Sequence, residues 1–475
     1  MQQLSPQDAS FLYAETPKAP MSGGQLTIYD PSTAPGGRVT FKGIMAHIEA
    51  RLHLADAFRQ RIVTVPLNAD HPWWVEDKNF DIEFHVRHIA LPEPGDWRQL
   101  CIQCARLISR ELDRSKPLWE FYVIDGLDRV KGYPPGCFAI LAKIHHAAVD
   151  GASGTELNAA IHDLEPDAPP PPPPTKEWQG ERIPSGQTLL GRAMWANTMQ
   201  PWRMVRTVGT AAAANRRVMQ LTRRVDGLMG QPGPAPRTRF NGPVSGHRSL
   251  DGIMLDLNDV RAIRTLSPGC TINDVFLALV GGALREYLMD KAELPAESLT
   301  AMCPIAVREE GERSTSGNSV AAMMVALRTD IADAATRLRE VHDGTKAAKE
   351  LANAIGTKAM TEMSGAIPAA LASLAGRLAA TLAIANERRS PPYNTVVTNV
   401  PGPQVPLYMD GARAVSVYGF GMIHDNMGLM NVVNSYCGKI AVSAASCRDM
   451  MPDPAFYAEC LQRSFDQLRT AAATG

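Results

Sequence analysis

Two apolar segments in the first half of the chain predict a buried β-hairpin. Residues 120–127 have the apolar and β-branched content of a strand, and residues 137–145 resemble a second, more deeply buried strand. The segment between them, residues 128–136, is rich in glycine and proline. We therefore expect two antiparallel strands, followed by a helix over residues 151–164.

The second half mixes helical and extended patterns. Residues 272–288 predict a strong helix, whereas residues 394–400 and 432–446 have strand patterns. Residues 367–385 are rich in alanine and leucine around a lone Arg377, which predicts a buried or lipid-contacting helix. Helices and largely non-alternating strands interleave irregularly, so the predicted fold class is α/β or α+β.

The chain has 475 residues, which suggests two or three domains. An unbroken proline run at residues 169–174 predicts a stiff spacer. Residues 181–240 then carry ten arginines and no lysine, interleaved with tryptophan and methionine. This pattern fits an amphipathic helix pair on an anionic lipid surface, or a crossover with a solvated basic face. We place a first lobe at 1–180, a basic linker at 181–240 and a second lobe at 241–475.

Composition narrows the class of protein. Apolar residues make up 45% of the chain, enough for a large core, and the net charge of −1 argues against a nucleic-acid partner. Neither a secretory signal nor an apolar run long enough to span a membrane is present. Cys101 and Cys104 have metal-like spacing but no second pair, so we expect reduced cysteines on a helix and a cytoplasmic protein.

The candidate chemistry lies where the second predicted strand ends. His145 and His146 close that strand, and Asp150 and Gly151 follow at a turn into a helix. Neutral imidazole is a suitable general base near physiological pH. Adjacent strand residues point to opposite faces, so only one histidine is expected to face a site. Asp150 could fix the imidazole tautomer or pair with an arginine, and Gly151 permits a tight turn.

Other reaction classes lack their motifs. The chain has no Gly-x-Ser-x-Gly nucleophile elbow, no phosphate-binding loop and no dinucleotide fingerprint after a strand. A metal site would need further ligands at helical spacing, and we expect none. The histidine pair alone is compatible with catalysis and with a structural role.

Several short motifs carry a family resemblance. His-His-x-x-x-Asp-Gly resembles the active-site motif of the CoA-dependent acyltransferases, which include chloramphenicol acetyltransferase and peptide-synthetase condensation domains. Other segments are similar to motifs of the bacterial wax ester synthase/diacylglycerol acyltransferase family, in the same order along the chain. These are residues 4–9 with Met21, Pro117-Leu118-Trp119-Glu120, Asn273-Asp274, residues 302–308, Gly317-Asn318, residues 399–403, Ser435-Tyr436 and Pro452-Asp453.

The resemblance implies two chloramphenicol-acetyltransferase-like lobes with a tunnel between them. It implies acyl transfer from acyl-CoA to diacylglycerol or a long-chain alcohol, at a membrane or lipid-droplet surface to which a cytoplasmic protein binds peripherally. His146 would be the base, His145 would be structural and Asp150 mainly architectural. Acyl-CoA would be a co-substrate, and no separate cofactor or covalent acyl-enzyme would be needed.

The roles of the second-half residues stay open. Asn273 is a candidate for polarising the thioester carbonyl or positioning the acceptor, whereas Asn273 and Asp274 could instead cap the following helix. Arg308 could bind a CoA phosphate or pair with Asp150. Residues 399–403 are most simply a rigid turn that ends a strand.

Two other functions compete with the acyl-CoA enzyme. One is a related acyltransferase that takes its acyl group from a carrier protein, although this chain contains no carrier domain. The other is a non-catalytic protein that binds lipid surfaces, suggested by the arginine-rich segment and the alanine-leucine segment. Neither the acceptor alcohol nor the acyl chain length follows from the sequence.

Overall fold

The structure, a computed structural model, describes residues 1–148, 157–175, 178–198, 234–306, 320–355 and 390–474. The described residues form two compact units. The first contains residues 1–198 and 403–419, and the second contains the rest. Among the described residues, the chain passes from the first unit to the second, returns to the first unit at residues 403–419, and then continues in the second.

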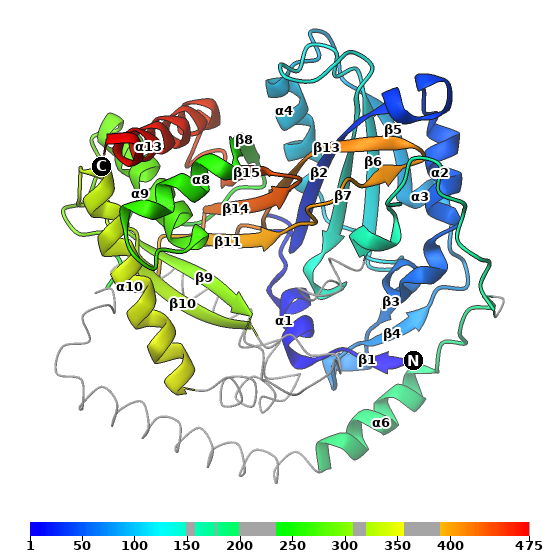
Figure 1. The fold of residues 1–475 in the computed structure, drawn as a ribbon. Helices are drawn as coiled ribbons and strands as arrows, with labels where there is room; N and C mark the ends of the chain where they lie inside the picture. Colours follow the sequence, from blue (N-terminus) through cyan, green and yellow to red (C-terminus); the bar gives the residue numbers. More distant parts are fainter. Residues whose placement is uncertain (149–156, 176–177, 199–233, 307–319, 356–389, 475) are drawn as a thin grey trace. The chain divides into compact units, whose positions relative to one another are not determined.

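The first unit is built on a six-stranded sheet of order β12-β13-β2-β7-β6-β5 (Figure 1). β7 pairs antiparallel with both β2 and β6, and β5 pairs parallel with β6. The predicted hairpin is confirmed, because β6 and β7 are the two strands expected from the apolar segments. The strands are β2 (Ser22–Asp30), β5 (Val86–Ala90), β6 (Trp119–Asp125), β7 (Phe138–His145), β12 (Tyr408–Met409) and β13 (Ala412–Phe420).

Two strands of this sheet come from the second half of the chain, which corrects the predicted second lobe at 241–475. β12 and β13 lie at the edge of the first unit's sheet. The Tyr133 hydroxyl lies 2.8 Å from Oγ of Ser416, and the ring of Trp97 packs on Tyr418. Backbone hydrogen bonds also join Asp163 to Tyr408. The strand β13 thus lies beside β2, although nearly 400 residues separate the two strands in the chain, and local sequence patterns do not reveal such a pairing.

Helices and a small sheet complete the first unit. The small sheet has the order β1-β4-β3. The helix α1 begins after Ser5, whose side chain accepts the Asp8 amide hydrogen, with Pro6 at its first position. The bounds are β1 (Gln2–Gln3), β3 (Gln60–Val63), β4 (Trp73–Glu76), α1 (Pro6–Ala14), α2 (Phe41–Glu49), α3 (Ile82–His85), α4 (Trp97–Ile108) and α6 (Gly186–Thr198).

One prediction about the first unit is confirmed, and a second concerns a segment that is only partly described. Cys101 and Cys104 lie on α4 as expected, and both are buried and free. The helix α6 lies near the start of the arginine-rich linker. Its Leu189 and Ala193 pack against Val65. Residues 199–233, the rest of the basic segment, lie outside the described residues.

The second unit has a six-stranded sheet of order β10-β9-β11-β14-β15-β8, with α8, α9, α10 and α13 beside it (Figure 1). The predicted helix at 272–288 and the strands at 394–400 and 432–446 are confirmed. The predicted helix at 367–385 lies outside the described residues. The bounds are β8 (Arg248–Asp256), β9 (Thr300–Ala306), β10 (Val320–Ala326), β11 (Thr395–Pro401), β14 (Leu429–Tyr436), β15 (Lys439–Cys447), α8 (Leu257–Ile263), α9 (Ile272–Asp290), α10 (Ala334–Ile355) and α13 (Pro454–Thr474).

The two faces of this second sheet differ. On one face, residues such as Ala301, Val325 and Val433 are buried. On the other, Met324, Met302, Val396 and Met430 lie side by side on β10, β9, β11 and β14. The three methionines are only half-buried. We call these four residues the methionine row.

Candidate active site

The histidine pair lies where β7 gives way to a short 3-10 turn, His146–Ala148. Two backbone hydrogen bonds hold this junction: His145 N–H donates to the Leu118 carbonyl at 3.0 Å, and His146 N–H donates to the Met21 carbonyl at 2.8 Å. The Pro117-Leu118-Trp119 and Met21 motifs therefore serve the same turn. The carbonyls of Leu118 and Met21 thus help to hold the two histidines in position.

His146 has an environment suited to a base. Its ring stacks on Phe11 of α1, with centroids 4.3 Å apart and 28° between the planes. Its buried Nδ1 has no hydrogen-bond partner among the described residues. Burial lowers the pKa of His146 below its ordinary value. The imidazole is therefore neutral at physiological pH and can accept a proton.

His145 has a different environment. It is fully buried, and its Nδ1 accepts the Ala147 N–H at 3.0 Å. Its Nε2 lies 3.4 Å from Oε1 of Glu15. As strand geometry predicts, the two histidines are not equivalent: one is locked in the interior and the other lies half-buried under an aromatic ring.

Glu15 is a residue that the sequence analysis missed. It follows α1 directly, and its carboxylate accepts the Met21 N–H at 3.0 Å and the Arg114 Nε–H at 3.0 Å. Burial alone would raise the pKa of Glu15, but His145, Arg114 and the Met21 amide outweigh it and lower the pKa to about 2. The sequence holds no signal for this role, because the partners lie up to 130 residues away.

The predicted residues of the second half separate into two roles. Asp274 is fully buried and completes a capping box with Thr271, the N-cap of α9. Its carboxylate also accepts hydrogen bonds from His342 (2.9 Å) and Thr345 (2.6 Å). Asn273 occupies the next position toward the helix start and is half-buried, and its side chain has no hydrogen-bond partner among the described residues. Asp274 is therefore an anchor, whereas Asn273 offers a free amide.

One group of donor atoms near this helix has metal-like proximity. Cys270, Asp274 and His342 each offer an atom within 4.8 Å of the others. Both Asp274 oxygens already accept hydrogen bonds, from Thr271, His342 and Thr345. The capping box and the hydrogen bonds from His342 and Thr345 therefore account for the position of the Asp274 carboxylate in this group.

The comparison with known families decides the identity. The wax ester synthase/diacylglycerol acyltransferase catalytic domain matches residues 4–276, and the C-terminal domain of the same family matches residues 316–469. This chain belongs to that family. The two family domains follow one another along the chain, and the short motifs noted in the sequence occur in the same order.

Individual relatives of the family agree. A Mycobacterium tuberculosis protein that carries the name of a diacylglycerol O-acyltransferase is 35% identical over 98% of this chain and 91% of its own. The wax ester synthase/diacylglycerol acyltransferase of Marinobacter aquaeolei VT8 matches with a TM-score of 0.69 and 26% identity, over 99% of this chain and 100% of that one.

A more distant match bears on the fold alone. The starter condensation domain of rhizomide synthetase matches with a TM-score of 0.53 and 13% identity, over 99% of this chain and 94% of that chain. The predicted two-lobed α/β class is thus confirmed. The tunnel that we predict between the lobes stays a prediction.

Other family motifs also meet in space. At the end of β11, Gly402 lies against Ser435 of β14, and a Cβ on Gly402 would be 2.2 Å from the Ser435 carbonyl oxygen. Gly402 N–H donates to Oγ of Ser435 at 3.2 Å. The Asn-Val-Pro-Gly-Pro segment therefore ends a strand, as predicted, and its glycine is required by a close backbone approach.

Some predicted residues are not described. Asp150, Gly151, Arg308 and Gly317-Asn318 lie outside the described residues, so their predicted roles remain predictions. Of the helix expected at 151–164, residues 157–160 are helical. The end of that segment is held by Arg51, whose guanidinium donates to both carboxylate oxygens of Asp163 at 2.7 and 2.9 Å.

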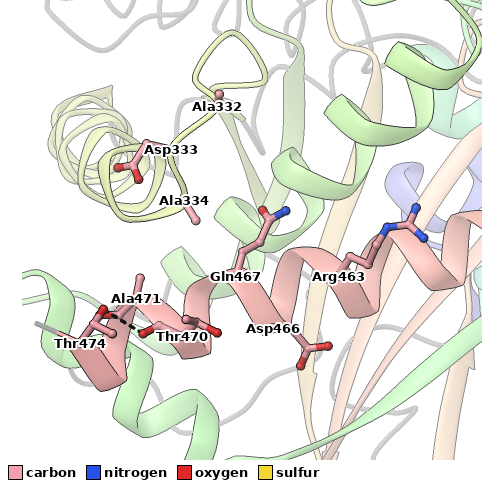
Figure 2. Close-up of a pocket in the computed structure, with 9 residues that line it drawn as sticks. All are labelled: Ala332, Asp333, Ala334, Arg463, Asp466, Gln467, Thr470, Ala471 and Thr474. Carbon is pink, nitrogen blue, oxygen red and sulfur yellow. Dashed lines mark hydrogen bonds between the residues drawn. The ribbon is translucent and has the colours of Figure 1, made fainter.

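A surface pocket of about 640 Å³ lies between the start of α10 and the end of α13 (Figure 2). Small and polar side chains line it, among them Asp333, which caps α10, and Arg463, which pairs with Glu286. None of the family's motif residues lines this pocket. The chemistry is therefore expected elsewhere.

Proposed function

We propose that this protein transfers a long-chain fatty acyl group from acyl-CoA to the hydroxyl of diacylglycerol or a long-chain alcohol, with His146 as the general base. Membership of the wax ester synthase/diacylglycerol acyltransferase family supports the reaction class. The observation that carries the assignment of the base is the half-buried His146 ring, stacked on Phe11, with its pKa lowered so that it is neutral.

The reaction needs one base and no covalent intermediate on the enzyme. The acceptor hydroxyl donates its proton to a ring nitrogen of His146 while its oxygen attacks the thioester carbonyl carbon. The tetrahedral intermediate then collapses and breaks the carbon–sulfur bond. The CoA thiolate takes the proton from the imidazolium, which yields the ester and free CoA. Acyl-CoA is a co-substrate in this scheme, and we propose no additional cofactor or metal.

Asn273 and Asp150 receive different roles in the proposal. The free amide of Asn273, at the start of α9, supports a role in donating a hydrogen bond to the thioester carbonyl or in orienting the acceptor. Asp274 anchors the helix that carries Asn273. Asp150 remains an architectural residue of the turn after His146, by resemblance to the wider superfamily.

We infer that the methionine row contacts an alkyl chain of a substrate. It crosses four adjacent strands, so it spans three strand spacings, or about 14 Å. Methionine side chains adapt to apolar partners of differing shape. An adaptable apolar surface of that length suits a long acyl chain of variable length.

Peripheral association with a membrane or lipid droplet also forms part of the proposal. The helix α6 exposes Met194 and Trp195, with relative exposures of 65% and 73%, beside the cationic Arg192. Exposed apolar and arginine side chains together favour an anionic lipid surface. Among the described helices, none is long and apolar enough to cross a membrane.

The test uses purified protein with labelled palmitoyl-CoA and a mixture of diacylglycerol and hexadecanol. Separation of the lipids should show labelled triacylglycerol, wax ester or both. His146→Ala should abolish ester formation, whereas His88→Ala, on a partly exposed histidine of β5, should not. Full activity of the His146→Ala protein would refute the assignment of the base.

A second donor separates the competing functions. Acyl-carrier protein loaded with the same acyl group should compete poorly with acyl-CoA if the proposal is correct. Turnover only from the carrier would favour the carrier-dependent alternative. No turnover from either donor, together with tight binding to lipid vesicles, would favour a non-catalytic lipid-binding protein.

A further inference from the structure

Four segments of the first unit meet at the carboxylate of Glu15. Oε1 accepts the Met21 N–H at the start of β2 and faces Nε2 of His145 at the end of β7. Oε2 pairs with Arg114, which follows α4. Glu15 itself continues directly from α1, the helix that places Phe11 on the His146 ring. The side chain of Glu15 is 1% exposed, so its carboxylate is shielded from water, whereas the Arg114 side chain is 41% exposed.

The hydrogen bonds of His145 determine where its proton lies. Nδ1 faces the N–H of Ala147 at 3.0 Å, so Nδ1 must accept and carries no proton. The proton of a neutral imidazole is then on Nε2. That atom has no hydrogen-bond partner of standard geometry among the described residues, and the Glu15 carboxylate at 3.4 Å is the anion that faces it.

The two supports of His146 lie close to the same carboxylate, one through a hydrogen bond and the other along the chain. The backbone of His146 is tied to the Met21 carbonyl, and Glu15 holds the amide of that same Met21. The ring of His146 rests on Phe11, four residues before Glu15 in the chain. The turn itself, His146–Ala148, is fixed by the bond from Ala147 to His145.

We propose that Glu15 is a positioning residue for acyl transfer: it holds His145 in the tautomer protonated on Nε2 and, through His145 and Met21, sets the position of the His146 ring. This inference rests on the proposed function of His146. Glu15 touches neither substrate nor the reacting atoms in this scheme. This role of Glu15 explains why the buried His145 directly precedes the proposed base, His146.

The test compares variants that remove different contacts. Glu15→Met removes both acceptor oxygens, and Glu15→Gln keeps an oxygen for Met21 and His145. Arg114→Gln removes the partly exposed ion pair with Glu15 and the hydrogen bond to the Leu12 carbonyl, but leaves the Met21 and His145 contacts in place. Because a displacement of about 1 Å of a reacting group can cost ~100-fold in rate, we expect kcat to fall about that much in Glu15→Met with little change in KM for acyl-CoA. Glu15→Gln and Arg114→Gln should stay within about threefold of the wild type.

A double-mutant cycle tests whether Glu15 acts through His145. In a His145→Ala background, Glu15→Met should lower kcat much less than it does in the wild type. A full additional loss there, or a Glu15→Met enzyme with wild-type kcat, would overturn the inference. Asp77→Asn serves as a stability control, because it alters a buried carboxylate of the same unit, paired with Arg61, that lies outside the histidine turn.

One measurement remains decisive if Glu15→Met does not fold, and a second remains decisive even if the wild type shows no turnover. His145→Asn retains an acceptor near Ala147 but loses the contact with Glu15, so wild-type kcat in this variant would overturn the inference. In protein labelled with ¹⁵N-histidine, nitrogen-15 NMR should show His145 with its proton on Nε2. Glu15→Gln should preserve that signal, and a wild-type His145 protonated on Nδ1 would refute the proposal independently of catalysis.

Discussion

The ring of Phe11 stacks on the ring of His146, with 4.3 Å between their centroids. Phe11 belongs to the helix formed by the N-terminal family motif, and His146 to the turn after β7. Two motifs separated by more than 100 residues therefore build one site, because the first supplies the apolar cover that the second requires.

Removing that cover should change the pH dependence of the reaction. Burial lowers the pKa of His146, so the neutral base is available at a lower pH than for an exposed histidine. Phe11→Ala admits water and should move the acid limb of the kcat/KM profile to higher pH, with a loss of roughly tenfold in kcat from the looser ring. Phe11→Leu keeps an apolar cover and should shift less. Identical pH–rate profiles for wild type and Phe11→Ala would contradict this role.

The sequence predicted the parts of the site that local patterns encode. The strands β6 and β7 were predictable from apolar segments because both are buried along nearly their whole length. The helix α9 was predictable in the same way. The position of β13 and the contact between Glu15 and His145 were not, because both depend on pairing between residues more than 100 positions apart. The sequence alone also left the roles of Asn273 and Asp274 open. The hydrogen bonds of Asp274, and their absence at the described Asn273 side chain, distinguish the two roles.

Asn273 and Asp274 should therefore respond differently to substitution. Asn273→Ala removes an amide with no described partner, so we expect unchanged thermal stability and a kcat lower by about 10²–10³-fold, as for loss of an oxyanion donor. Asp274→Ala leaves buried donors unpaired, each of which costs ~1–3 kcal/mol. Its main effect should be a lower free energy of unfolding in urea. Equal losses of stability in the two variants would argue against this division.

Acid stability offers a test of the Glu15 environment. The pKa of Glu15 is lowered from 4.5 to about 2, so the folded chain binds its proton less readily than the unfolded chain. The stabilisation is thus fully present above about pH 4.5 and is lost as the pH falls toward 2. The difference in free energy of unfolding between wild type and Glu15→Gln should shrink over that range. If this difference in free energy of unfolding stays constant from roughly pH 6 to roughly pH 3, the lowered pKa of Glu15 is refuted.

Gly402 should tolerate no side chain. The Cβ of an alanine there would approach the Ser435 carbonyl oxygen to 2.2 Å, and backbone rather than a flexible side chain is the obstacle. We expect Gly402→Ala to lower the free energy of unfolding by about 1–3 kcal/mol or to shift β11 against β14. Gly344 on α10 is the matched control, because no heavy atom lies within 4 Å of its added Cβ. Gly344→Ala should be neutral or stabilising.

The methionine row predicts a change in chain-length selectivity. Met324→Phe and Met430→Phe each place a stiffer, bulkier side chain on the half-buried face of the second sheet. If an acyl chain lies there, kcat/KM should fall for palmitoyl-CoA more than for octanoyl-CoA, because a short chain reaches fewer strands of the row. Met289→Phe, at a methionine 54% exposed on α9, should leave the ratio unchanged. A parallel series of alcohols of different length at fixed acyl-CoA identifies the occupant: a shift only in the alcohol series would assign the row to the acceptor, and no shift in either series would exclude it as a chain-binding surface.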